Sequence, residues 1–139
     1  MANDTYIRQA GAIPLRNGRL CLVTSRRNPK RWVIPKGLID PGYTPGAAAL
    51  QEAWEEAGLV GTLDPEPVGA YVYDKYGGTC HVTVFVMHVT KVAQEWPERE
   101  SRQRVWVTPA GAIRRLDDPS LIDIVRAVVA AEPTLLGTS

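Results

Sequence analysis

The chain has 139 residues, of which 45 % are hydrophobic and 22 % are charged, and its formal net charge is +1 at pH 7. This length and composition are typical of a globular protein, and we expect residues 1–139 to form a single domain with one core. The near-neutral charge argues against a nucleic-acid polymer as partner. Because there is no apolar run of about 18 residues and Met1–Gln9 are too polar for a signal peptide, we expect a cytoplasmic protein without a membrane partner.

The N-terminal part of the chain is predicted to form strands. Ile7–Leu15 and Leu20–Thr24 are largely apolar, and the Asn17-Gly18 pair between them is a strong signal for a β-hairpin. Trp32–Ile34 predicts a short buried strand, which leads into a loop rich in glycine and proline, Gly37–Gly46. We therefore expect a sheet whose third strand leads directly into this loop.

Basic side chains are concentrated just before the loop. Five of them lie within 11 residues: Arg26, Arg27, Lys30, Arg31 and Lys36. Guanidinium groups bind phosphate oxygens in a bidentate manner, and a lysine ammonium adds a point charge. A basic cluster is often only a solvated loop, and this alternative stays open. The candidates for binding phosphate are Arg26, Arg27 and Lys36, together with Arg8 and Arg16 from the neighbouring strand and turn.

The segment after the loop predicts a short helix with an acidic face. Thr44 can cap its N-terminus, Pro45 suits the first helical position, and Gly58 suits the left-handed residue that ends a helix. Three carboxylates follow one another at relative positions i, i+3 and i+4, which places their Cβ atoms about 5–6 Å apart on one face. They belong to Glu52, Glu55 and Glu56.

Carboxylates held so close repel each other, and a divalent cation would supply the missing attraction. Carboxylate oxygens are the ligands that Mg²⁺ and Mn²⁺ prefer, and Mg²⁺ is typically bound by one or two carboxylates together with substrate phosphates. For the three carboxylates alone, a solvated acidic helix face is the alternative. The preceding loop favours the metal-binding interpretation, because it can present backbone carbonyls to the same point.

The remainder of the chain predicts further strands and two helices. The expected strands are Val60–Leu63, Pro67–Tyr73, Cys80–Lys91 and Arg104–Val107, and the expected helices are Pro109–Leu116 and a terminal helix beginning at Pro119. Cys21 and Cys80 lie in apolar strands without CxxC spacing, so we expect buried free thiols. The aromatic residues Trp32, Tyr71, Tyr73 and Tyr76 could stack on a base, although packing is the simpler interpretation for aromatic residues in strands.

The segment from the glycine-rich loop to the end of the acidic helix resembles the Nudix box, G-x5-E-x7-R-E-U-x-E-E-x-G-U, where U is aliphatic. The matching positions are Gly37, Glu52, Ala53, Glu55, Glu56, Gly58 and Leu59. Two positions depart, since Tyr43 stands where the pattern has Glu and Gln51 stands where it has Arg. Both replacements are neutral and able to form hydrogen bonds, so replacing both charges together leaves no unpaired ion, and the two side chains could occupy the space of a bracing ion pair.

This resemblance implies a fold, a cofactor and a reaction. The fold is the α/β/α sandwich of the family, a mixed sheet between helices. The family binds Mg²⁺ or Mn²⁺ through residues that correspond to Glu55, Glu56 and the carbonyl of Gly37, and it hydrolyses pyrophosphate bonds. Glu52 could bind the metal or take a proton from water, and both uses occur in the family. A late-loop carboxylate sometimes participates as well, which makes Glu95 or Glu98 a candidate, although surface charge is the simpler interpretation.

A longer resemblance narrows the substrate. Arg8–Arg16, Leu20–Trp32 and the run Glu56–Leu63 are similar to the diphosphoinositol polyphosphate phosphohydrolase branch, which includes diadenosine polyphosphate hydrolases. The resemblance implies a small phosphorylated substrate of one of these kinds, and we expect a monomer or homodimer. The alternatives are a Nudix hydrolase of another branch, acting on nucleotides or nucleotide sugars, and a catalytically weakened Nudix fold that serves as a nucleotide-binding or regulatory module.

Overall fold

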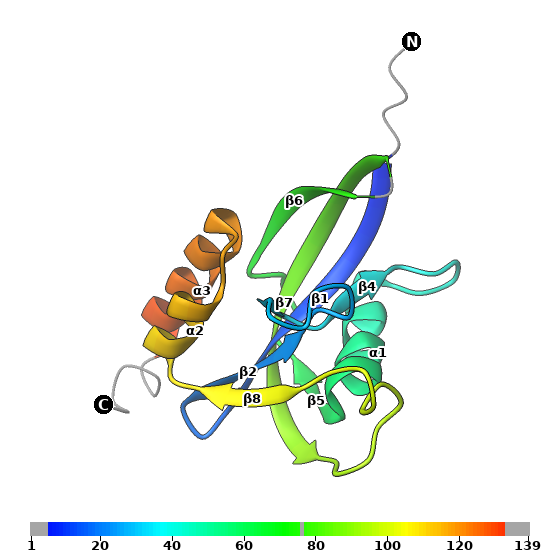
Figure 1. Ribbon diagram of the computed structural model, residues 1–139. Helices are drawn as coiled ribbons and strands as arrows, with labels where there is room; N and C mark the ends of the chain where they lie inside the picture. The colour runs from blue at the N-terminus through cyan, green and yellow to red at the C-terminus, as the bar shows by residue number, and fades with distance from the viewer. Residues whose placement is uncertain (1–5, 76, 133–139) are drawn as a thin grey trace.

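The computed structural model describes residues 6–75 and 77–132, so Tyr76 lies outside the described residues, as do the ends of the chain. The strands are β1 (Tyr6–Arg16), β2 (Arg19–Thr24), β3 (Trp32–Val33), β4 (Lys36–Leu38), β5 (Leu59–Leu63), β6 (Gly69–Lys75), β7 (Gly78–Val92) and β8 (Arg104–Val107). The helices are α1 (Pro45–Ala57), α2 (Pro109–Arg115) and α3 (Pro119–Ala131). Figure 1 shows α1 on one side of the strands and α2 with α3 on the other.

The described strands form one mixed sheet, as predicted. Long strands β1 and β7 pair in parallel, from Tyr6 opposite Thr79 to Leu15 opposite His88. Every other pairing is antiparallel. Strand β1 is long enough to pair with β2 at its end and with β4 near its beginning, so it connects the hairpin to the segment that precedes α1.

Alternating side chains of the sheet enter the cores on its two faces. On β1, Ile13 belongs to the core beneath α2 and α3, whereas Ala12 belongs to the core beneath α1. The α1 side is built largely from small residues, which let a helix approach a sheet closely. Those buried on α1 are Ala48, Ala49, Ala53 and Ala57. The α/β/α sandwich predicted from the sequence is therefore confirmed.

Strand β4 was missed by the sequence reasoning, which assigned Gly37 and the residues after it to a loop. Lys36–Leu38 instead pairs with β1, with Gly37 opposite Ala10. A three-residue strand that contains glycine has no periodic pattern of its own, and its pairing depends on the open edge that the long β1 provides. The consequence for the site is direct, because β4 places the Gly37 backbone beside α1.

The two cysteines are buried and free, as predicted. Burial raises the pKa of the Cys21 thiol to about 12, and Cys80 is fully buried as well. Since the thiolate is the reactive form, we expect neither cysteine of the native protein to react with Ellman's reagent at about pH 8, and both to react in denaturant. Absorbance of the released thiolate measures this, and rapid labelling of the native protein would contradict it.

None of the helices among the described residues combines the length and apolar character needed to cross a membrane.

Candidate active site

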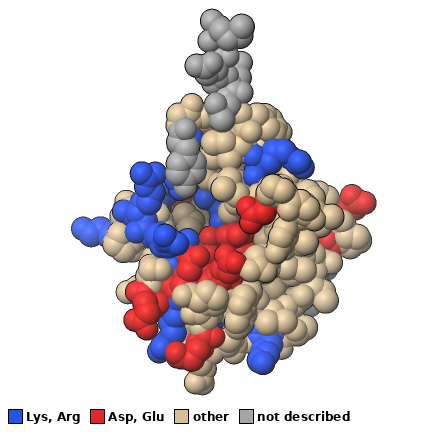
Figure 2. All heavy atoms as spheres, turned by 90° about the vertical axis from the view of Figure 1, so that its right-hand side faces the viewer, with Lys and Arg blue, Asp and Glu red and all other residues tan. Residues whose placement is uncertain are grey.

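A pocket of about 530 Å³ opens between α1, β4, β6 and the loops that follow β2 and β7. Figure 2 shows the face of the molecule that carries α1, where acidic side chains gather at the centre and basic side chains border them. Of the candidates from the sequence, the pocket is lined by Arg26, Arg27, Lys36, Gly37, Glu52 and Glu56. The structure therefore brings most of the predicted site residues to one place.

The centre of the site is formed by two carboxylates of α1 and the backbone of β4. The side chains of Glu52 and Glu56 lie one turn apart on α1 and line the same pocket, close enough for the charge of each to affect the ionisation of the other. Gly37 lies so close to Glu52 that a Cβ added to it would overlap the carboxylate. Glycine is therefore needed at this position for a close approach of backbone and carboxylate, and not for a special backbone conformation.

Glu56 is the most buried acidic residue of the site, with 5 % of its surface exposed. Its Oε1 accepts a hydrogen bond from the backbone N–H of Lys36 at 3.2 Å. Its Oε2 lies 3.3 Å from Nη2 of Arg102. Burial raises the pKa of Glu56 above its usual range, and the Arg102 guanidinium offsets part of this rise. Burial raises the pKa of Glu52 as well.

Lys36 is held at the side of the pocket by a short polar network. Its Nζ donates to the Tyr73 hydroxyl at 3.0 Å, and that hydroxyl donates to Oε1 of Gln9 at 2.7 Å. Burial lowers the pKa of Lys36 to about 8, although nearby Glu56 acts in the opposite direction. Gln9 and Tyr73 therefore orient this ammonium in the pocket, a role for which the sequence contains no local signal.

The aromatic candidates occupy different environments. Tyr71 is buried in the core, which confirms the packing interpretation for it, while Trp32 and Tyr73 pack against that core. All three also line the pocket. Tyr76, the fourth residue considered for stacking, lies outside the described residues.

Two of the predicted phosphate ligands do not line the pocket. Arg8 is exposed on β1, opposite His81 of β7. Arg16 lies at the turn end of β1, opposite Arg19. The sequence reasoning added both to the basic loop as residues of the neighbouring strand and turn. Arg8 adjoins Gln9, which lines the pocket, so the alternation of β1 turns the Arg8 side chain to the other face, and Arg16 lies at the far end of the strand. Arg27 lines the pocket, and it forms no ion pair with any residue that the structure describes.

Glu55 is not brought to the carboxylate pair. It accepts a hydrogen bond from Nε2 of Gln51, one turn earlier on α1, and does not line the pocket. Gln51 is exposed and bonds to Glu55 rather than to Tyr43, whose side chain is also exposed. Tyr43 and Gln51 therefore do not pair with each other, and they do not replace a bracing ion pair.

The loop between β7 and β8 contributes two further charged residues. Glu98 lines the pocket, where it pairs with Arg26 at 3.4 Å and with Arg102 at 2.7 Å. Glu95 pairs with Arg99 on the surface. Of the two carboxylates considered in this loop, Glu98 is therefore the one at the site. The sequence reasoning did not single out Arg102.

The donor set fits a hard divalent cation. Two carboxylates in contact, both with pKa values raised by burial, lack sufficient positive charge around them when both are ionised. A cation between them would supply that charge, and oxygen donors are those that Mg²⁺ and Mn²⁺ prefer. Glu52 and Glu56 are two residues that could hold it.

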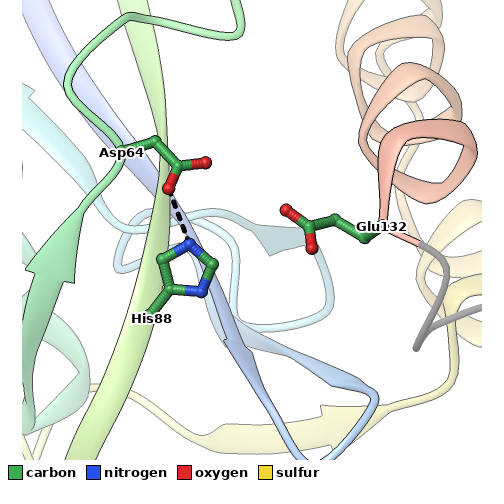
Figure 3. Close-up of side chains that lie close together, drawn as sticks. All are labelled: Asp64, His88 and Glu132. Carbon is green, nitrogen blue, oxygen red and sulfur yellow. Dashed lines mark hydrogen bonds and ion pairs between the residues drawn. The ribbon is translucent and has the colours of Figure 1, made fainter.

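A second group of possible metal donors lies away from the pocket. Asp64, His88 and Glu132 each offer one ligand atom, and these atoms all lie within 4.8 Å of one another. In Figure 3, His88 on β7 bonds to Asp64 after β5, and Glu132 points toward them from the end of α3. None of the three lines the pocket. The two side chains of the His88–Asp64 pair are nearly half exposed, and their bond of 2.7 Å joins β7 to the residue that follows β5.

Comparison with known proteins identifies a family and several relatives. The sequence model of the family described as NUDIX domain matches residues 5–128. Diphosphoinositol polyphosphate phosphohydrolase 3-alpha of Homo sapiens is 36 % identical over 104 residues, covering 73 % of this chain and 62 % of the relative. Diphosphoinositol polyphosphate phosphohydrolase 2 of Mus musculus is 33 % identical over 97 residues, covering 68 % and 52 %. The chain thus spans less than two thirds of these curated relatives.

Solved structures share the fold. The crystal structure of C. elegans Ap4A hydrolase has a TM-score of 0.74 at 21 % identity, covering 91 % of this chain and 98 % of that one. A MutT protein from Methanosarcina mazei Go1 has a TM-score of 0.71 at 18 % identity, with coverages of 95 % and 99 %. At these identities the likeness concerns the arrangement of the sheet and helices.

Proposed function

The chain belongs to the Nudix family, as its sequence predicted, and from this premise we propose that it is a divalent-metal-dependent hydrolase of a pyrophosphate bond. The proposed substrate is a polyphosphorylated small molecule, either a diadenosine polyphosphate or a diphosphoinositol polyphosphate. The proposed cofactor is Mg²⁺ or Mn²⁺, and residues 1–139 would form the single domain that carries the activity. The observation that carries the proposal is the contact between Glu52 and Glu56 beside Gly37, inside a pocket bordered by basic side chains.

In this proposal the acidic and the basic side chains of the pocket have different roles. Glu56 and the Gly37 carbonyl would hold the cation, and Glu55, which is bonded to Gln51 in this structure, is a further candidate ligand. When bound, the cation neutralises charge on the substrate and lowers the pKa of a water molecule. Glu52 is either a ligand or the group that accepts the proton of that water. Arg26, Arg27 and Lys36 bind the phosphate oxygens on the side of the pocket.

Charge supports a highly phosphorylated substrate. A dinucleoside polyphosphate or an inositol pyrophosphate carries more negative charge than a nucleotide sugar, and a single cation offsets only part of it. Arg27 forms no ion pair among the described residues, and the Lys36 ammonium, which lines the pocket, donates to the neutral Tyr73 hydroxyl. Both are therefore available to substrate phosphates. The relatives named for diphosphoinositol polyphosphates are consistent with this choice.

The test is phosphate or nucleotide release from a substrate panel with and without Mg²⁺. The panel contains diadenosine polyphosphates, diphosphoinositol phosphates, nucleoside triphosphates and ADP-ribose. We expect metal-dependent turnover of one of the first two classes. A preference for ADP-ribose would overturn the substrate class and leave the reaction intact. Tight binding without any turnover would instead favour the regulatory module.

Replacing Lys36 by alanine should reduce kcat/KM for the polyphosphorylated substrate at least tenfold. Charge-assisted contacts contribute about 1.5–3 kcal/mol each, and a factor of ten requires about 1.4 kcal/mol. ADP-ribose, if turned over, should lose much less. Lys30→Ala is the matched control, since Lys30 belongs to the same basic cluster but does not line the pocket. Steady-state kinetics on both substrates measures the difference, and equal losses for both would contradict the assignment.

A further inference from the structure

The loop between β7 and β8, residues 93–103, is attached to the C-terminal end of α1. The last carbonyls of a helix have no partner within the helix, and here residues from the loop and from the start of β8 donate to them. The bonds are Glu98 N to Glu55 O (3.0 Å), Trp96 Nε1 to Glu56 O (3.0 Å) and Arg104 Nη1 to Ala57 O (2.8 Å). The loop is therefore positioned by the backbone of the residues that carry the acidic cluster.

This attachment brings one guanidinium against Glu56. The Arg102 side chain is only 10 % exposed, and each of its three nitrogens has a partner. Nη2 lies 3.3 Å from Glu56 Oε2, Nε donates to Glu98 Oε1 at 2.7 Å, and Nη1 donates to the Thr24 carbonyl at 2.9 Å. Such a rigid fork fixes the direction of its bonds as well as supplying a charge.

The Glu56 carboxylate is thereby held from both sides. The Lys36 backbone N–H binds Oε1, and Arg102 lies against Oε2, so the plane of the carboxylate is determined by two separate segments. The helix itself does not supply the basic residue expected by the family pattern, because position 51 is glutamine and bonds to Glu55. Among the described residues, Arg102 is the one whose guanidinium forms an ion pair with a carboxylate of the Glu52–Glu56 pair.

We propose that Arg102 is a positioning residue, which holds the Glu56 carboxylate from the β7–β8 loop in the orientation needed to bind the divalent cation. The proposal rests on the proposed function of the same pocket. It assigns Arg102 a part in arranging a metal ligand, without contact with the substrate.

A purely electrostatic role makes opposite predictions. If Arg102 only supplied a charge, lysine would substitute for it, and cation binding would stay like that of the parent. If it positions Glu56, lysine fails almost as badly as methionine, because one ammonium cannot make the three directed bonds of the fork. Arg102→Lys and Arg102→Met therefore separate the two roles.

The experiment measures Mn²⁺ binding to the whole chain by calorimetry, together with kcat and KM. We expect both Arg102 variants to weaken Mn²⁺ binding and to lower kcat at least about tenfold, as is typical when a group that orients a metal ligand is lost, with KM changed less than about twofold. Arg99→Met is the matched control, because Arg99 lies in the same loop and pairs with the exposed Glu95. It should behave like the parent.

Each remaining outcome is decisive. Parent-like affinity in Arg102→Lys, or tighter binding in Arg102→Met, would overturn the positioning role. If Arg102→Met does not fold, as judged by its thermal transition, the lysine variant alone carries the comparison, since it retains the charge opposite Glu98. Failure of the parent itself to bind Mn²⁺ would count against the proposed function, and is thus distinguishable from failure of the inference.

Discussion

Replacing Glu56 by glutamine should lower kcat at least about 100-fold, which corresponds to about 2.7 kcal/mol of lost transition-state stabilisation. Glutamine keeps the shape of the side chain but removes the charge that would hold the cation. The fold should survive, because the backbone contacts around position 56 remain and Arg102 retains Glu98 as a partner. We expect the free energy of unfolding to change by less than about 1 kcal/mol. Activity assays at saturating Mg²⁺ and a denaturant titration measure the two effects.

The control for this variant is His88→Ala. His88 belongs to the other group of metal-donor side chains, with Asp64 and Glu132, and does not line the pocket. This variant should retain the parent's turnover and metal dependence within about twofold. A folded Glu56→Gln protein with near-normal activity would contradict the assignment of Glu56 as a metal ligand. Loss of metal dependence in His88→Ala would instead indicate that the metal binds at the group formed by Asp64, His88 and Glu132.

Replacing Gly37 by alanine should reduce kcat/KM by about 10- to 100-fold while leaving the fold intact. The added Cβ would overlap the Glu52 carboxylate, which is the far end of a flexible side chain and can move away. The strand keeps its pairing with β1, so the cost falls on the position of Glu52, and displacement of a catalytic group by about 1 Å can cost such factors. Gly46→Ala is the matched control, because its Cβ would meet only Leu63 at 3.5 Å.

A double-mutant cycle tests the cause of the Gly37 effect. If alanine acts by moving Glu52, the variant Gly37→Ala with Glu52→Gln should be no worse than the more impaired single variant. Independent effects would add instead. Kinetics of the four proteins, with thermal transitions to check folding, decides between these outcomes. Additive losses would mean that Gly37 acts through its own backbone and not through Glu52.

The acidic helix and its ends could be predicted from the sequence, because capping and helical periodicity depend on residues within a few turns of each other. Thr44 Oγ1 accepts the hydrogen bond from Ala47 N at 3.1 Å, and Gly58 adopts the left-handed conformation with φ of 68°. The long strands were predicted for the same reason, since their apolar patterns are local. The spacing of the box is local as well, and it sufficed to predict the family.

Which carboxylates act together was decided by the tertiary structure. All three were expected on one helical face, yet Glu56 turns toward Glu52 while Glu55 bonds to Gln51. The spacing permits two i,i+4 pairs, Glu52 with Glu56 and Gln51 with Glu55. Glu56 is the residue that contacts the backbone of β4 on one side and Arg102 on the other, so its pair is the one that lies in the pocket. The burial of a carboxylate depends on segments that the helix sequence does not contain.

The basic side chains also divide into those that local sequence placed correctly and those that only the tertiary structure placed. Arg26, Arg27 and Lys36 line the pocket as their sequence cluster predicted, because they lie in the loop and strand that lead directly to it. Arg8 and Arg16 do not, since the alternation of β1 turns Arg8 to the face opposite Gln9 and the length of β1 places Arg16 at the far end. Arg102 reaches the site through bonds between distant segments. Composition and local pattern determined the family and the acidic helix, whereas long-range pairing determined which charges meet, because ion pairs between distant segments leave no periodic signal in the sequence.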